Sequence, residues 1–83
     1  MRKRDLRDVD LSGANLSGAN FSGVNLIGAN LGGTDLSYAD FSSAMLNHAN
    51  LSHANLNRTN LSRANLCDAL INQTTVIAEK CRS

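Results

Sequence analysis

The chain has 83 residues, and its eight Lys and Arg residues nearly balance its seven Asp and Glu residues, for a net charge of +1. Between residues 12 and 57 the only formal charges are Asp35 and Asp40. This balance argues against a phosphate-binding field and against a dense negative surface, so nucleic acid is not an expected partner. No stretch approaches the roughly 20 apolar residues of a membrane span, so we expect no membrane partner either.

Four of the first five residues, Met1-Arg2-Lys3-Arg4-Asp5, have charged side chains. Charge of this kind is typical of a sheet edge that is protected against pairing with other chains. No apolar run follows these residues, so they do not resemble a secretory signal. We therefore expect the protein in the cytoplasm. Its length predicts a single small domain.

A five-residue period begins at Leu6, and from there every fifth residue is large and apolar. A small residue stands two positions before it, Asn or Asp stands between them, and Ser then Gly often follow. Neither a helix nor a straight strand keeps such a repeat on one side. A chain that turns the same corner once per repeat brings every large residue back to the inside, so we expect short strands between corners. The predicted inward core consists of the large residues Leu11, Leu16, Phe21, Leu26, Leu31, Leu36, Phe41, Leu46, Leu51, Leu56, Leu61 and Leu66.

The corner falls on the Ser-Gly pair, because Gly adopts positive φ at little steric cost. Right-angle corners close a square after four repeats, which makes a coil of twenty residues. Successive coils then stack at about 4.8 Å through backbone hydrogen bonds. Phe21 and Phe41 lie twenty residues apart and are predicted to share one inward column.

Repeats such as Ala14-Asn15-Leu16-Ser17-Gly18 resemble the A(D/N)LXX motif of pentapeptide repeat proteins. The resemblance extends from residue 4 to about residue 76, with departures at Met45 and Leu70. It implies an all-β fold, a right-handed quadrilateral β-helix (a solenoid) of about four coils with twenty residues per coil. We place this β-helix at residues 1–76 and a C-terminal tail or cap at residues 77–83.

Four polar residues, His48, His53, Arg58 and Arg63, take the corner position that Gly holds earlier in the chain. One interpretation is a basic patch for phosphate or nucleic acid. The square places them at four successive corners, pointing in four directions, so we favour solvated corner residues. The same divergence argues against a zinc site formed by His48, His53, Cys67 and Asp68.

The outward Asn columns have two interpretations, a surface that binds a partner and a side-chain ladder between coils; we favour the ladder. Residues twenty apart should also pair across coils, His48 with Asp68 and Tyr38 with Arg58. The two cysteines, Cys67 and Cys81, occupy different positions of the twenty-residue frame. We expect both to be free thiols.

The C-terminal stretch departs from the repeat and carries Leu70, Ile71, Val76 and Ile77. These residues are predicted to form an interface. Either the tail folds over the last coil as a cap, or two chains meet there about a two-fold axis as a homodimer. We favour the dimer.

No sequence motif indicates catalysis, a metal site or a cofactor site, so we expect no enzyme and no cofactor. The leading hypothesis is a structural or protein-interaction module that presents flat Asn/Ser-rich faces to another protein. The alternative comes from the family resemblance: a DNA mimic that binds type II topoisomerase, of the quinolone-resistance type. The neutral charge and the short length argue against that alternative.

Overall fold

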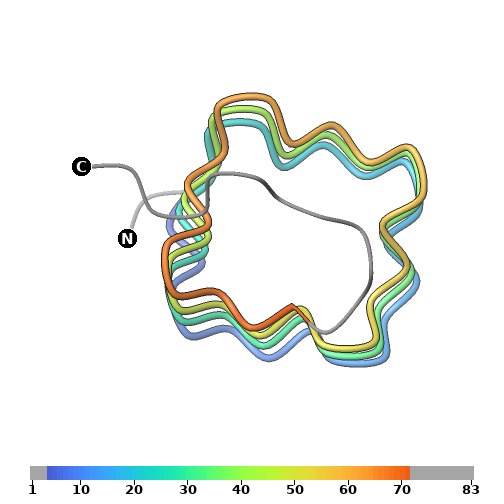
Figure 1. The fold of residues 1–83 in the computed structure, drawn as a ribbon, viewed down its shortest axis with the longest axis horizontal. Coiled ribbons are helices and arrows are strands. Elements are labelled where there is room, and N and C mark those ends of the chain that lie inside the picture. Colours follow the sequence, from blue (N-terminus) through green and yellow to red (C-terminus); the bar gives the residue numbers. More distant parts are fainter. Residues whose placement is uncertain (1–3, 72–83) are drawn as a thin grey trace.

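The computed structural model describes residues 4–71 and shows a chain wound into stacked coils. Figure 1 shows the coils lying almost on top of one another around a ring with four sides. Isolated parallel β-bridges join residues twenty apart, from Asp5 with Asn25 to Asn50 with Leu70. The described residues contain no helix and no strand longer than one bridge.

Backbone hydrogen bonds explain why this repeat stacks so regularly, and the repeat 29–33 uses all five of its N–H groups. Ala29 donates to Leu26 within the turn, Asn30 donates to Val9 of the preceding coil, and Leu31 and Gly33 donate to Asn50 and Ser52 of the next coil. The fifth N–H, of Gly32, donates to the side-chain oxygen of Asn30. A buried backbone group without a partner is costly, so this complete pairing is a main source of stability.

Each corner is a four-residue turn whose third residue has positive φ. The N–H of the small residue donates to the carbonyl of the large residue three positions earlier, as in the bond from Ala14 to Leu11. The third turn residue is Gly18 at φ 74° in an early repeat and Arg63 at φ 62° in a late one. Positive φ at this position is characteristic of type II turns. The predicted Gly corner is therefore confirmed, and it persists where Gly is replaced.

The large residues point into the ring and fill it. Leu26, Leu31, Leu36, Phe41 and Leu46 are fully buried, and small residues such as Ala29 and Ala49 complete the core. The remaining large residues that we predicted to be inward are buried at Leu51, Leu56 and Leu66, and half-buried at Leu11, Leu16, Phe21 and Leu61. The half-buried ones belong to the first or the last described coil, where residues 4–71 supply a neighbouring coil on one side only.

The coil of twenty residues and the shared column of Phe21 and Phe41 are confirmed. The expected short strands are wrong, because a corner in every repeat leaves only one residue per side to form a bridge. Residues 4–71 complete about three and a half coils at twenty residues per coil. The boundary that we placed between residues 76 and 77 lies outside the described residues.

Candidate interaction surfaces

The outward Asn and Asp side chains are bonded to their own corners. The side-chain oxygen of Asn15 accepts the N–H of Ser17 at 3.1 Å, and that of Asn20 accepts the N–H of Ser22 at 3.0 Å. The bond from Asn50 Nδ2 to Asn30 Oδ1, at 3.4 Å, is a contact of the ladder type. That Asn30 oxygen also accepts the N–H of Gly32 at 3.0 Å, so one oxygen can serve both contacts. The predicted ladder is nevertheless wrong as the main role of these columns, because the bond to the backbone N–H recurs from repeat to repeat within residues 4–71 and the amide contact does not. These residues form Asx turns, which hold each corner rigid.

Three of the outward carboxylates lie in such turns and have lowered pKa values. The hydroxyl and the N–H of Ser37 both donate to Asp35, and this lowers the pKa of Asp35. Ser12 lowers the pKa of Asp10 in the same way. The backbone N–H of Ser42 is the larger cause of the lowered pKa of Asp40. Hydrogen bonds to the ionised form stabilise it, so these three groups remain negative well into the acid range.

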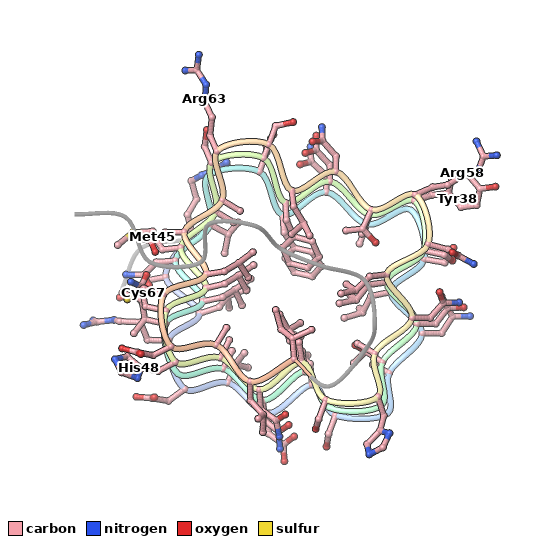
Figure 2. All side chains as sticks on the ribbon, in the orientation of Figure 1. Tyr38, Met45, His48, Arg58, Arg63 and Cys67 are labelled. Carbon is pink, nitrogen blue, oxygen red and sulfur yellow. The ribbon has the colours of Figure 1, made fainter. Side chains whose placement is uncertain are left out.

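One side of the ring differs from the other three, and we call it the Met45 face. It comprises two outward columns, which read Asp5, Asn25, Met45, Asn65 and Arg7, Ile27, Asn47, Cys67. The other sides carry Asn, Asp, Ser and Gly at the corresponding positions, apart from Leu70. Figure 2 shows Met45, Cys67 and His48 projecting outward along this one side of the ring.

Met45 is the main departure from the repeat on this face, and it has a structural cost. It is 41% exposed and stands where other repeats place Asn or Asp. It has no side-chain oxygen to accept the N–H of Asn47, and no other acceptor for that N–H lies within residues 4–71. The Oδ1 atom of Asn47 is also buried without a partner in the described part of the chain. A buried polar group without a partner destabilises a fold, so in residues 4–71 the Asn47 Oδ1 atom, together with the unpaired N–H of the same residue, requires an explanation.

One ion pair and one His–carboxylate contact lie along the Met45 face. Arg7 contacts Asp5 at 2.8 Å, and this bidentate contact raises the pKa of Arg7. At the corner of the face, His48 Nε2 lies 3.8 Å from Asp68 Oδ2. The predicted His48–Asp68 pair is therefore confirmed. Both residues of the second pair are exposed, so it adds little stability.

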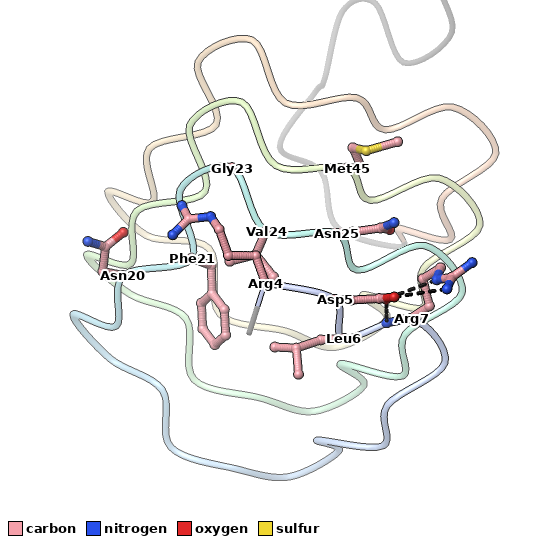
Figure 3. Close-up of a pocket in the computed structure, with 10 residues that line it drawn as sticks. All are labelled: Arg4, Asp5, Leu6, Arg7, Asn20, Phe21, Gly23, Val24, Asn25 and Met45. Carbon is pink, nitrogen blue, oxygen red and sulfur yellow. Dashed lines mark hydrogen bonds and ion pairs between the residues drawn. The ribbon is translucent and has the colours of Figure 1, made fainter. Parts of the chain in front are cut away.

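A depression joins the Met45 face to the N-terminal end of the stack, as Figure 3 shows. Its volume is about 1200 Å³. Leu6, Phe21, Val24 and Met45 supply its apolar lining, and Arg4, Asp5, Arg7, Asn20, Gly23 and Asn25 supply the rest. The guanidinium of Arg4 donates to the carbonyl of Ser22 beside it. The depression therefore combines apolar side chains with Arg4 and with the Arg7–Asp5 ion pair.

The predicted corner residues do not form one site. His48, Arg58 and Arg63 project from different corners in Figure 2, while Tyr38 and Arg58 share a corner as predicted. His48, His53, Arg58 and Arg63 all have positive φ. Nowhere in residues 4–71 do three His, Cys, Asp or Glu side chains come together as metal ligands would, so the zinc site that we disfavoured has no support there.

The predicted C-terminal interface is described only in part. Leu70 is 57% exposed, and Ile71 is half-buried against the core. Val76 and Ile77 lie outside the described residues. The expectation of two free thiols is wrong, because Cys67 is disulfide-bonded. Cys81 lies outside the described residues.

The Met45 face was not among our predicted sites, although its signal was present in the sequence. Ile27, Met45 and Cys67 occur at intervals of about twenty residues, and each interrupts an otherwise polar position. Only the stacked coil shows that these departures fall on one side. Within the described part of the chain, no helix has the length and apolar character to cross a membrane.

Comparisons with known proteins identify the repeat. The profile described as "Pentapeptide repeats" matches residues 5–42 and 34–73 with eight copies. No curated protein sequence gives a significant match. Among solved structures, a pentapeptide repeat protein from the thylakoid lumen of Arabidopsis thaliana is 38% identical with a TM-score of 0.81 and 86% of this chain covered.

Two cyanobacterial structures are also similar. Rfr23 from Cyanothece 51142 is 31% identical, with a TM-score of 0.76 and 82% of this chain covered. HetL from Nostoc sp. strain PCC 7120, described as involved in the regulation of heterocyst differentiation, is 31% identical, with a TM-score of 0.68 and 87% covered. This chain spans 50%, 47% and 42% of the Arabidopsis, Cyanothece and Nostoc proteins, respectively.

Proposed function

Because the chain belongs to the pentapeptide repeat family, we propose that it is a non-enzymatic protein-interaction module. In this proposal the coils form the right-handed quadrilateral β-helix of that family. The flat sides present rigid Asn and Ser columns, and the Met45 face makes the central contact with a protein partner.

The observation that carries this proposal is the replacement of the repeat's Asn by Met45. The replacement removes the acceptor for the N–H of Asn47 and leaves an exposed apolar side chain. Sites where a sequence departs from the locally favoured residue at a cost to stability are often functional. Met, aromatic residues and Arg are enriched at protein interfaces, and the face carries Met45 beside Arg7.

A non-enzymatic role also fits the state of the polar side chains. An activated nucleophile needs a neighbouring general base held within hydrogen-bond distance. The hydroxyls of Ser12 and Ser37 instead donate to carboxylates that hold their own corners. The side-chain oxygens of Asn15 and Asn60 likewise accept corner N–H groups. These groups serve the fold rather than a reaction.

The DNA-mimic alternative requires a continuous acidic surface. Asp10, Asp35 and Asp40 belong to three different sides of the ring, because each lies in a different position of the twenty-residue coil. Asp5, Asp8 and Asp68 lie on the fourth side and its corner, where Arg7 pairs with Asp5 and His48 contacts Asp68. The described carboxylates are therefore spread around the ring rather than lined up along one side. We retain the interaction module as the proposal and treat topoisomerase inhibition as an outcome that would replace it.

The cellular location is a separate question, and a measurement on Cys67 addresses it. We expected the cytoplasm from the sequence, whereas a disulfide such as that of Cys67 is typical of oxidising compartments. Labelling of thiols in freshly lysed cells measures the fraction of Cys67 that is oxidised. A largely reduced Cys67 supports the cytoplasm, and a largely oxidised one supports an oxidising compartment.

Affinity capture from the native cell extract tests the proposed function. The wild type, Met45→Asn and Ser62→Ala are used as bait, where Ser62 is an exposed residue on another side of the ring. We expect one or more proteins to bind the wild type and Ser62→Ala, and to be lost with Met45→Asn. Equal capture by all three baits would contradict the role of the Met45 face. Capture of a type II topoisomerase, with inhibition of its activity, would favour the alternative.

A further inference from the structure

One corner within residues 4–71 lacks the hydrogen bond that holds the others. At every other repeat between residues 5 and 67, the outward Asn or Asp accepts the backbone N–H two residues later, at 2.9 to 3.3 Å. One coil away on the Met45 face, for example, Asn25 accepts the N–H of Ile27 at 3.1 Å. Met45 offers no such oxygen, so the N–H of Asn47 has no acceptor among the described residues.

This gap lies in the interior of the stack. Met45 forms β-bridges with Asn25 in the preceding coil and with Asn65 in the next coil, so both neighbouring coils are described. The backbone of Met45 is also fully paired, because its N–H donates to Val24 and its carbonyl accepts from Leu26. Only the side chain departs from the repeat. The free N–H of the next corner is therefore a consequence of the residue type at position 45.

The free N–H faces the outer surface, because its acceptor in the other repeats is an outward side chain. Met45 projects outward beside it (Figure 2) and is 41% exposed. Ile27 stands one coil away in the same column as Asn47. The surface thus offers a single hydrogen-bond donor next to apolar side chains. A partner that displaces water from these side chains must also supply an acceptor, since a buried donor without one is costly.

The charges along the face indicate which kind of oxygen fits. The guanidinium of Arg7 contacts Asp5 at 2.8 Å, and His48 lies 3.8 Å from Asp68. Each basic group already faces a carboxylate of this chain, so a partner's carboxylate beside Met45 would lack a counter-ion. Desolvation of an unpaired carboxylate costs far more than desolvation of a neutral carbonyl. The complementary acceptor is therefore a neutral amide carbonyl.

We propose that the Met45 face binds an extended segment of a partner protein through an amide carbonyl that accepts the N–H of Asn47. An apolar side chain of the segment packs on Met45. The partner's oxygen takes the place of the side-chain oxygen that this repeat lacks. The carbonyl comes from the main chain or from an Asn or Gln side chain, which present the same acceptor. This inference rests on the proposed function and adds the chemistry by which the partner is recognised.

Two substitutions of Asn47 isolate the role of its N–H. Asn47 is the second residue of its turn, because the N–H of Ala49 donates to the carbonyl of Leu46. Pro is favoured at the second residue of a type II turn, so Asn47→Pro removes the N–H and keeps the turn. Asn47→Ser is the matched control. It removes the same side chain and keeps the N–H, and Ser37 occupies the equivalent place in another repeat.

Peptides selected on the wild-type chain from a phage-displayed random library are the probe. Fluorescence anisotropy measures their Kd for each variant, and circular dichroism confirms that the variants are folded. We expect Asn47→Ser to bind like the wild type, and Asn47→Pro and Met45→Asn to bind about tenfold or more weakly. Amide exchange followed by NMR is a second measurement that needs no variant. The Asn47 N–H of the wild type should exchange more slowly in the complex than in the free chain.

Equal affinities of Asn47→Pro and Asn47→Ser would overturn the inference. So would unchanged amide exchange at Asn47 in the complex, or a library that yields no peptide dependent on Met45. Alanine substitution along the selected peptide separates the two sources of the carbonyl. Loss of affinity at one Asn or Gln assigns the side chain, and no such position assigns the main chain, whereas a requirement for Asp or Glu would overturn the neutral acceptor. The proposed function fails on a different result, equal capture by all baits from the cell extract.

Discussion

Phe21 and Phe41 stack face to face in the core, with ring centroids 5.0 Å apart and ring planes inclined by 10°. They lie twenty residues apart and occupy the same position in successive coils. Their separation matches the rise from one coil to the next, which is set by backbone hydrogen bonding at about 4.8 Å. The backbone pairing therefore places the two rings in contact, and the rings in turn fill the column.

Replacement of Phe41 tests this column. Phe41→Ala should lower the free energy of unfolding by about 3–5 kcal/mol, because it leaves a cavity beside Phe21. Phe41→Leu should cost clearly less, because Leu61 already occupies the next place in the column. Urea unfolding followed by circular dichroism measures both values. Equal losses for Ala and Leu would contradict a column that accepts either side chain.

The inward leucines should dominate stability. Leu36 is fully buried, so Leu36→Ala should cost about 2–5 kcal/mol. Ser62→Ala is the control on the exposed surface and should change stability by less than about 0.5 kcal/mol. The comparison uses midpoints of urea unfolding at one protein concentration, since association would shift them. Similar midpoints for the two variants would show that the inward and outward assignments are wrong.

Met45→Asn should stabilise the fold while it weakens binding. The new side-chain oxygen would accept the N–H of Asn47, as Asn65 does for Cys67 at 3.0 Å. One recovered hydrogen bond is worth about 0.5–1.5 kcal/mol. Met45→Ala, which restores no acceptor, serves as the control. Thermal unfolding of the three proteins measures the difference, and a Met45→Asn protein less stable than Met45→Ala would refute the explanation.

Arg63→Gly should also raise stability. Arg63 has a φ of 62°, a conformation that costs an L-residue about 1–2 kcal/mol and costs Gly nothing. The greater chain entropy of Gly in the unfolded state offsets part of this gain, so we expect an increase of about 0.5–1 kcal/mol. Arg63→Ala keeps the strained conformation and should show no such gain. Calorimetric unfolding distinguishes the two variants, and the same melting temperature for both would contradict the strain.

Stability should fall in acid because of the aspartates in the corners. The pKa values of Asp10, Asp35 and Asp40 lie below the ordinary value of 3.8 in the folded chain. Their contribution to the free energy of unfolding is therefore complete above the pKa of the unfolded chain, near 3.8. This contribution is lost as the pH falls through the lower pKa values of the folded chain. The triple variant Asp10→Asn, Asp35→Asn, Asp40→Asn should flatten this dependence, because Asn makes the same corner elsewhere. Urea midpoints between pH 2 and pH 6 measure it, and an unchanged slope in the variant would argue against these three groups.

The sequence by itself determined the coil. A five-residue period fits neither a helix nor a strand, so it required a corner in each repeat. The recurring Gly placed the positive φ of that corner, and Phe21 and Phe41 indicated the twenty-residue frame. These are local and periodic properties, and a regular stack repeats them without further information.

Only the tertiary structure decided how the outward side chains are used. We considered a partner-binding surface and a side-chain ladder for the Asn columns. The structure adds a third use, a bond to the backbone N–H two residues away in a fixed turn, and this bond is more frequent than the ladder contact. The Met45 face became visible only when stacking brought residues from successive coils to one side. Contacts between distant residues depend on the exact stacking geometry, which the period alone does not specify.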